Sequence, residues 1–113
     1  GVTFKANTDD MRDSSSLSMI PSLVRKGAKV NYYDPTGEKN EFKKIKNVNF
    51  SKNIKSAIKD SDLVIIHTEW NDFKTINFNK DVSNKKFILF DMRNIYSPVK
   101  MKDLKINYFG VGH

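Results

Sequence analysis

Short apolar runs of strand length alternate along the chain with longer segments that have one apolar face or none. The run Leu-Val-Ile-Ile at 63–66 is apolar on both faces, which is typical of a strand buried inside a parallel sheet. The other runs predict strands at 1–4, 29–33, 87–90 and 107–111, and the run at 48–50 predicts a short strand or an extended passage.

Helix signals lie between these runs. Serines at 14–16 offer N-caps to an apolar helical face over 17–24, and Gly27 is placed to end that helix. Pro21 removes one backbone donor inside this segment, so we expect a bend or a late start there. Shorter helical segments are expected at 53–59 and 97–102, and the stretches at 39–49 and 70–76 read as loops or short helices.

The alternation of strands with helices predicts an α/β fold: a Rossmann-like open parallel sheet of about five strands, with helices on both faces. A length of 113 residues predicts one domain covering 1–113, without an internal boundary. The chain opens within a strand-like run, so we expect it to be one domain of a longer protein.

Composition narrows the range of functions. The formal charge is +7, but 17 of the 20 cations are lysines spread over the whole chain, which favours a solvated surface. A nucleic-acid patch, or a basic field that attracts an anionic substrate, remains an alternative. The absence of cysteine excludes disulfides, thiolate metal sites and a thiol nucleophile within this chain, and it fits a reducing cytoplasm. With two histidines, no metal site is expected, and no apolar run is long enough for a membrane span.

Two cations follow the first predicted strand. Lys5 comes directly after it and Arg12 precedes the first helix, so both are expected at the carboxyl edge of the sheet, where open α/β sheets bind ligands. Both can neutralise phosphate. In the alternative, Arg12 only pairs with a neighbouring acid among 9–13. Asp9 and Asp10 are more typical of loop-fixing hydrogen bonds than of a metal or catalytic pair.

Arg93 ends a later strand two residues after Asp91, which places it at the same edge, either on an anion or paired with Asp91. Trp70 is expected in the core or an interface. His67 is expected to be a strand residue with satisfied ring nitrogens, without an evident serine partner. No nucleophile, base and orienter come together, so we expect no catalytic residue here. A G-x-G-x-x-G phosphate loop is also missing.

Five segments resemble the C-terminal UDP-binding domain of the UDP-glucose/GDP-mannose dehydrogenase family. They are, in chain order, GVTFKANTDDMRDS at 1–14, YDP at 33–35, DLVIIHTEW at 62–70, DMRNI at 91–95 and YFGVG at 108–112. The resemblance implies an enzyme with an NAD-binding domain, a central dimerisation region and this domain last. It also implies oxidation of a nucleotide-sugar alcohol to a carboxylate by NAD, through a cysteine of the central region.

The same resemblance implies roles for four residues. Phe4, Lys5 and Arg93 would contact the UDP-sugar, and Arg12 would reach the NAD held by the first domain. The sequence at 7–10 is similar to members that act on UDP-glucose, whereas Ser15-Ser16 departs from the Ser-Pro of many members. Without the cysteine and the NAD loop, this chain alone is expected to be inactive. The alternatives are a stand-alone receiver-like signalling domain and a basic nucleic-acid-binding module.

Overall fold

The computed structural model describes residues 1–2 and 5–111 of the chain. Its elements, in chain order, are α1 (Ser16–Arg25), β1 (Val30–Tyr32), η1 (Asn40–Phe42), β2 (Val48–Phe50), α2 (Ile54–Ile58), β3 (Leu63–Ile66), η2 (Asn71–Thr75), α3 (Phe78–Asp81), β4 (Ile88–Asp91), α4 (Pro98–Asp103) and β5 (Asn107–Gly110). All strand pairs are parallel, so the α/β prediction is confirmed. Among these residues, no helix is long and apolar enough to cross a membrane.

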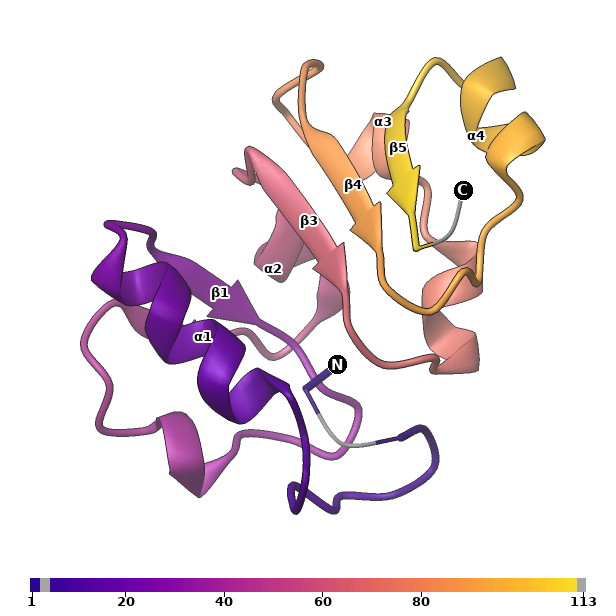
Figure 1. The fold of residues 1–113 in the computed structure, drawn as a ribbon. Helices are drawn as coiled ribbons and strands as arrows, with labels where there is room; N and C mark the ends of the chain where they lie inside the picture. Colours follow the sequence, from indigo (N-terminus) through magenta and orange to yellow (C-terminus); the bar gives the residue numbers. More distant parts are fainter. Residues whose placement is uncertain (3–4, 112–113) are drawn as a thin grey trace.

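The strands form two sheets. β1 pairs with β2, and the second sheet has the order β3-β4-β5. Figure 1 shows α1 packed on one face of the β1 side of the molecule, while α2 and α3 lie behind β3 and β4 on the opposite face. Helices therefore lie on both faces, as the alternation of strands and helices predicts.

The first predicted strand is not observed as a strand. Residues 3–4 lie outside the described part of the chain, and Gly1 and Val2 have no strand conformation. Side chains satisfy the Val2 backbone instead of a ladder: its N–H donates to Asp34 Oδ2 at 2.8 Å, and its carbonyl accepts from the hydroxyls of Ser14 (2.7 Å) and Ser16 (2.6 Å). The five observed strands form two sheets and not the single sheet that the sequence predicts.

The helix α1 starts at Ser16 and runs through Pro21, so it does not start late, and the bend given as the other possibility stays a prediction. Ser15 occupies the N-cap position without a side-chain cap bond, because its hydroxyl bonds His67 instead. The predicted end is confirmed: Gly27 has φ +96°, and the Ala28 N–H bonds back to the carbonyl of Leu23. A positive φ at this position is the usual reason for glycine after a helix.

Two apolar clusters hold the elements together. The larger one lies between the β3-β4-β5 sheet and the helical segments behind it, with Val82 and Leu89 fully buried. Trp70 belongs to this cluster, as expected of a core residue, although its Nε1 has no hydrogen-bond partner among the described residues. The smaller cluster joins Val2 and Ile20 to the β1-β2 sheet.

The other face of β3-β4-β5 exposes apolar side chains. The strand register sets Leu63 beside Ile88 and Phe90 beside Phe109, and all four are at least 39% exposed. Because Phe109 is 57% exposed, replacing it with lysine removes little buried area.

We expect Phe109→Lys to change the free energy of unfolding by about 0.5 kcal/mol or less. Leu89 lies in the neighbouring strand but is 0% exposed, so Leu89→Ala should lose about 3 kcal/mol. Urea unfolding of both variants measures the contrast. Equal losses would contradict the assignment of the two sheet faces.

Candidate anion-binding site at the carboxyl edge of the strands

The loop that precedes α1 lies beyond the carboxyl ends of β1 and β3, close to the first residues of the chain (Figure 1). The ends of β3 and β4 point to the same side, because the strands are parallel and paired in register. We call this side the carboxyl edge. It is where an open α/β sheet offers a crevice to ligands.

Arg93 is held at the carboxyl edge by two different bonds. Its side-chain Nε donates to the carbonyl oxygen of His67 at 3.0 Å, and its backbone N–H donates to Asp91 Oδ1 at 3.1 Å. The next residue, Asn94, has φ +56°, so the chain turns sharply there. The guanidinium is thereby fixed across the end of β3 while the residue stays exposed.

Asp91 is a fully buried carboxylate that ties three segments together. Besides the Arg93 N–H, it accepts the Tyr96 N–H at 3.0 Å and the Tyr108 hydroxyl at 2.7 Å, both on Oδ2. Burial raises the pKa of Tyr108, and the bond to Asp91 raises it further, so the phenol remains a donor. Asp91 positions Arg93 through the backbone, as a structural carboxylate rather than a simple surface ion-pair partner.

His67 links the loop before α1 to the end of β3. Its Nε2 lies 2.7 Å from Ser15 Oγ, and its Nδ1 lies 3.1 Å from Thr68 Oγ1. The expectation of a satisfied ring is confirmed, but the expectation that no serine accompanies it was wrong. The partners are 52 positions apart, so no local motif could show the pair. Thr68 occupies the place where a catalytic triad has a carboxylate, so the pair lacks an acidic orienter.

The pKa of His67 is lowered to about 4, mainly by burial and further by the positive charges of the Gly1 amino group and Arg93. The imidazole stays neutral in the folded state but titrates with its usual pKa in the unfolded state. The free energy of unfolding therefore depends on pH. Between pH 6.5 and 4 the unfolded chain binds more protons, so the folded state is destabilised as the pH falls.

We expect His67 to account for a loss on the order of 3 kcal/mol in the free energy of unfolding between pH 7 and pH 4. His67→Gln should flatten that dependence. Urea unfolding at several pH values checks it, and the difference between the two proteins separates His67 from other titrating groups. Parallel pH profiles for both proteins would contradict a buried neutral imidazole.

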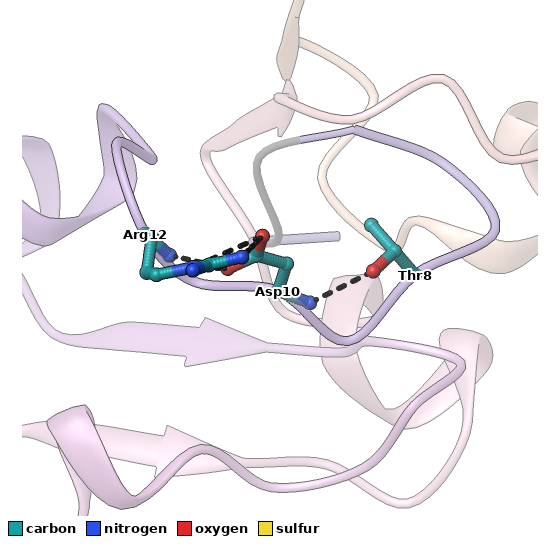
Figure 2. Close-up of polar contacts among 3 residues, drawn as sticks. All are labelled: Thr8, Asp10 and Arg12. Carbon is teal, nitrogen blue, oxygen red and sulfur yellow. Dashed lines mark hydrogen bonds and ion pairs between the residues drawn. The ribbon is translucent and has the colours of Figure 1, made fainter.

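Arg12 lies against Asp10 (Figure 2). Its Nη2 is 3.0 Å from Asp10 Oδ2, its Nε donates to Oδ1 at 3.1 Å, and its backbone N–H donates to Oδ1 at 2.9 Å. The Asp10 N–H in turn donates to Thr8 Oγ1 at 3.2 Å. This is the local pairing that the sequence left open as an alternative. The Arg12 side chain is still 87% exposed, so one side of it faces solvent.

The remaining predicted residues are less defined. Lys5 is exposed and near enough for its charge to help lower the pKa of Asp10, after the larger effect of the Arg12 bonds. Phe4 lies outside the described residues. Asp9 is exposed, and no group of three or more His, Cys, Asp or Glu in the described part of the chain could hold a metal ion.

Asp34 is a buried acid that the sequence analysis did not single out, and it binds the backbone of the first residues of the chain beside the carboxyl edge. Asp34 accepts the Val2 N–H at 2.8 Å and the Thr36 N–H at 2.9 Å. Burial acts to raise its pKa, but these bonds and the Thr36 hydroxyl outweigh burial, so the pKa is lowered. The tripeptide at 33–35 is among the segments that resemble the family, but nothing local shows that the Asp34 carboxylate bonds the Val2 backbone 32 positions away.

Comparison with known proteins gives the same family as the sequence motifs. Residues 1–98 match the model of the "UDP-glucose/GDP-mannose dehydrogenase family, UDP binding domain". A UDP-glucose 6-dehydrogenase of Rhizobium meliloti (strain 1021) is 37% identical over 113 residues, 99% of this chain and 26% of that protein. One from Rickettsia bellii (strain RML369-C) is 38% identical over 116 residues, again 99% and 26%.

The fold also resembles a solved structure, the NDP-N-acetyl-D-galactosaminuronic acid dehydrogenase from Methanosarcina mazei Go1. The TM-score is 0.83 with 19% identity, and the match covers 100% of this chain and 23% of that one. The chain therefore spans about a quarter of the length of the relatives that it matches.

Proposed function

The chain belongs to the UDP-glucose/GDP-mannose dehydrogenase family, and from that premise we propose that its carboxyl edge binds the diphosphate of a UDP-sugar. The observation that carries the proposal is the fixed guanidinium of Arg93. It is exposed, held in place by His67 and Asp91, and located where parallel strands end. A planar guanidinium offers a fork of donors to phosphate oxygens. Family membership favours this function over the receiver-like and nucleic-acid-binding alternatives.

In this proposal each predicted residue keeps its role. Lys5 and Arg93 bind the diphosphate, and Phe4 contacts the sugar nucleotide. Arg12 reaches NAD held by another domain of the same protein, and its 87% exposed side chain leaves it accessible to such a partner. Asp10 competes for the Arg12 guanidinium, so binding the cofactor would require Arg12 to share or exchange that bond.

The whole protein, in the same proposal, is an NAD-dependent UDP-glucose 6-dehydrogenase. Bound NAD would supply the hydride acceptor, and this chain would supply binding and orientation of the substrate. Residues 1–113 would form its last domain, and the protein would be a cytoplasmic homodimer. The chain has no cysteine and no G-x-G-x-x-G loop, so we expect it to reduce no NAD by itself.

Calorimetric titration tests the proposed ligand. UDP and UDP-glucose should bind the 113-residue chain with similar, weak affinity, whereas uridine at the same concentration should give no heat of binding, because it lacks the phosphates. Raising the salt concentration should weaken the UDP signal, since charge dominates the contact. Equal binding of uridine, or no binding of UDP at millimolar concentration, would refute a diphosphate site.

A further inference from the structure

The strand β5 is the last strand of its sheet, and its outer edge has no partner strand in the described part of the chain. A hollow of about 650 Å³ lies along this edge. It is lined by residues 105–110 and by Pro98 and Lys102 of α4, the helix that packs beside β5 (Figure 1). We call this hollow the β5 groove. Neither Arg12 nor Arg93 lines it, so it is distinct from the anion site.

The outer edge of β5 presents backbone hydrogen-bonding groups. The Val111 N–H donates to the Asp91 carbonyl oxygen at 3.3 Å, so Val111, and Phe109 two residues before it, direct their backbone groups toward β4. Tyr108 and Gly110 alternate with them and therefore direct their N–H and C=O groups outward, along the groove. An extended peptide that adds to a sheet binds such groups through its own backbone. Gly110 has no side chain, so another backbone can approach it closely.

The strand lacks the features that usually protect a free edge. Proteins prevent unwanted pairing at such edges with charged side chains or proline on the strand, or with a bulge. The four residues Asn107–Gly110 include no charge and no proline, and they pair with β4 in an unbroken register. The outer edge of β5 is therefore able to accept another strand.

The two sides of the groove differ in chemistry. Phe109 is 57% exposed and lies on the open, apolar face of the sheet. Tyr108 points to the opposite face, where it packs against the cluster that contains Met101 of α4. Lys102 follows Met101 and is exposed, and Lys105 is exposed just before β5, so this side is cationic. Among the described residues that line the groove, none is acidic.

We propose that the β5 groove binds an extended segment of another protein, in which apolar and acidic residues alternate, as one more strand of the β3-β4-β5 sheet. Side chains of a strand point to its two faces in turn. The apolar residues would pack beside Phe109, and the acidic residues would lie on the side of Lys102 and Lys105. Because β5 has four residues, a matching segment needs about five.

Charge determines which kind of partner fits. The chain has a formal net charge of +7, so a second copy of it is repelled, whereas an acidic segment is attracted. Complementary charge also sets the specificity, because a basic segment in the same place would put like charges beside Lys102 and Lys105. The expected partner is therefore an acidic segment and not a second copy of this chain.

The test uses a synthetic peptide, acetyl-Val-Glu-Val-Glu-Val-amide, as the probe. Two control peptides differ from it in one respect each: one has lysine in place of both glutamates, and the other has proline in place of the central valine. Backbone NMR of the 113-residue chain follows each titration, and amide hydrogen exchange is measured at the highest peptide concentration. The same titrations are made on Lys102→Glu and on Lys55→Glu, which changes an exposed lysine of α2 outside the groove.

Binding of the probe should shift the amides of 106–110 and reach saturation. Exchange of the Tyr108 and Gly110 amides should slow at least about fivefold, since these would become paired, whereas the Phe109 amide already points to β4 and should change little. The lysine peptide should bind at least about tenfold more weakly because like charges meet. The proline peptide should also lose at least about tenfold, because proline cannot donate to a ladder.

The variants separate a local contact from the general charge. Lys102→Glu should lower the affinity for the probe about fivefold, and Lys55→Glu should stay within about twofold of the unmodified chain. Equal binding of the lysine peptide, or shifts without added protection of Tyr108 and Gly110, would overturn the proposal. So would protection of these two amides in the chain alone as its concentration rises, because a second copy would then be the occupant.

Discussion

Arg93→Glu is expected to lower the affinity of the chain for UDP-glucose by about 100-fold or more. The substitution removes a charge-assisted contact of about 1.5–3 kcal/mol and puts a carboxylate near the phosphates. Because the unmodified chain already binds weakly, isothermal titration calorimetry should detect no heat of binding for Arg93→Glu under conditions in which the unmodified chain gives a signal. Arg93→Lys keeps the charge without the fork and should lose about tenfold.

A matched control shows whether net charge alone explains the effect. Arg25 is exposed in the last turn of α1, and Arg25→Glu changes the net charge by the same amount as Arg93→Glu. Its affinity for UDP-glucose should stay within about twofold of the unmodified chain, because screening weakens charges beyond about 10 Å. Equal losses for the two variants would indicate a diffuse basic field instead of a site.

Asp91→Ala is expected to destabilise the fold by about 3 kcal/mol or more. The change leaves the buried Tyr96 N–H without an acceptor and leaves the Tyr108 hydroxyl only its longer bond to the Tyr96 carbonyl oxygen at 3.3 Å. It also opens a cavity, and an unsatisfied buried group alone carries a penalty of about 1–3 kcal/mol. That loss is a large fraction of the stability of a small domain. Urea unfolding measures it.

Two further variants make the Asp91 result specific. Asp91→Asn keeps one oxygen acceptor and should lose less than Asp91→Ala. Asp103→Ala removes an exposed acid of α4 and should stay within about 0.5 kcal/mol of the unmodified chain. A small effect of Asp91→Ala, similar to that of Asp103→Ala, would contradict the role of Asp91 as the carboxylate that positions Arg93 through its backbone.

The local pattern of apolar and polar residues was sufficient to predict most of the secondary structure. The run at 63–66 has the bounds of β3, and the boundaries of β2 are those of the run at 48–50. These segments carry strong apolar patterns and clear turn signals, which are local properties. The segment at 1–4 also has a short strand-like pattern, but side chains of Asp34, Ser14 and Ser16 bond the Val2 backbone in place of a ladder.

The candidate site was predictable only in part. Position after a strand was enough to place Arg93 at the carboxyl edge, because parallel strands end at the same side. The pairing of Ser15 with His67, and the carboxylate of Asp91 shared by three donors, join residues distant in sequence. Such contacts depend on how the elements pack, and composition or spacing carries no signal for them. Binding by Lys5, Arg12 and Arg93 stays a prediction.

Backbone NMR of the 113-residue chain during titration with UDP-glucose tests the central claim most directly. If the carboxyl edge holds the diphosphate, amide shifts should concentrate at 66–68 and 92–94 and at the loop before α1, and should saturate together. Arg93→Glu should abolish them. Shifts confined to the lysine-rich segment at 39–59, or growing linearly without saturation, would contradict a diphosphate site at this edge.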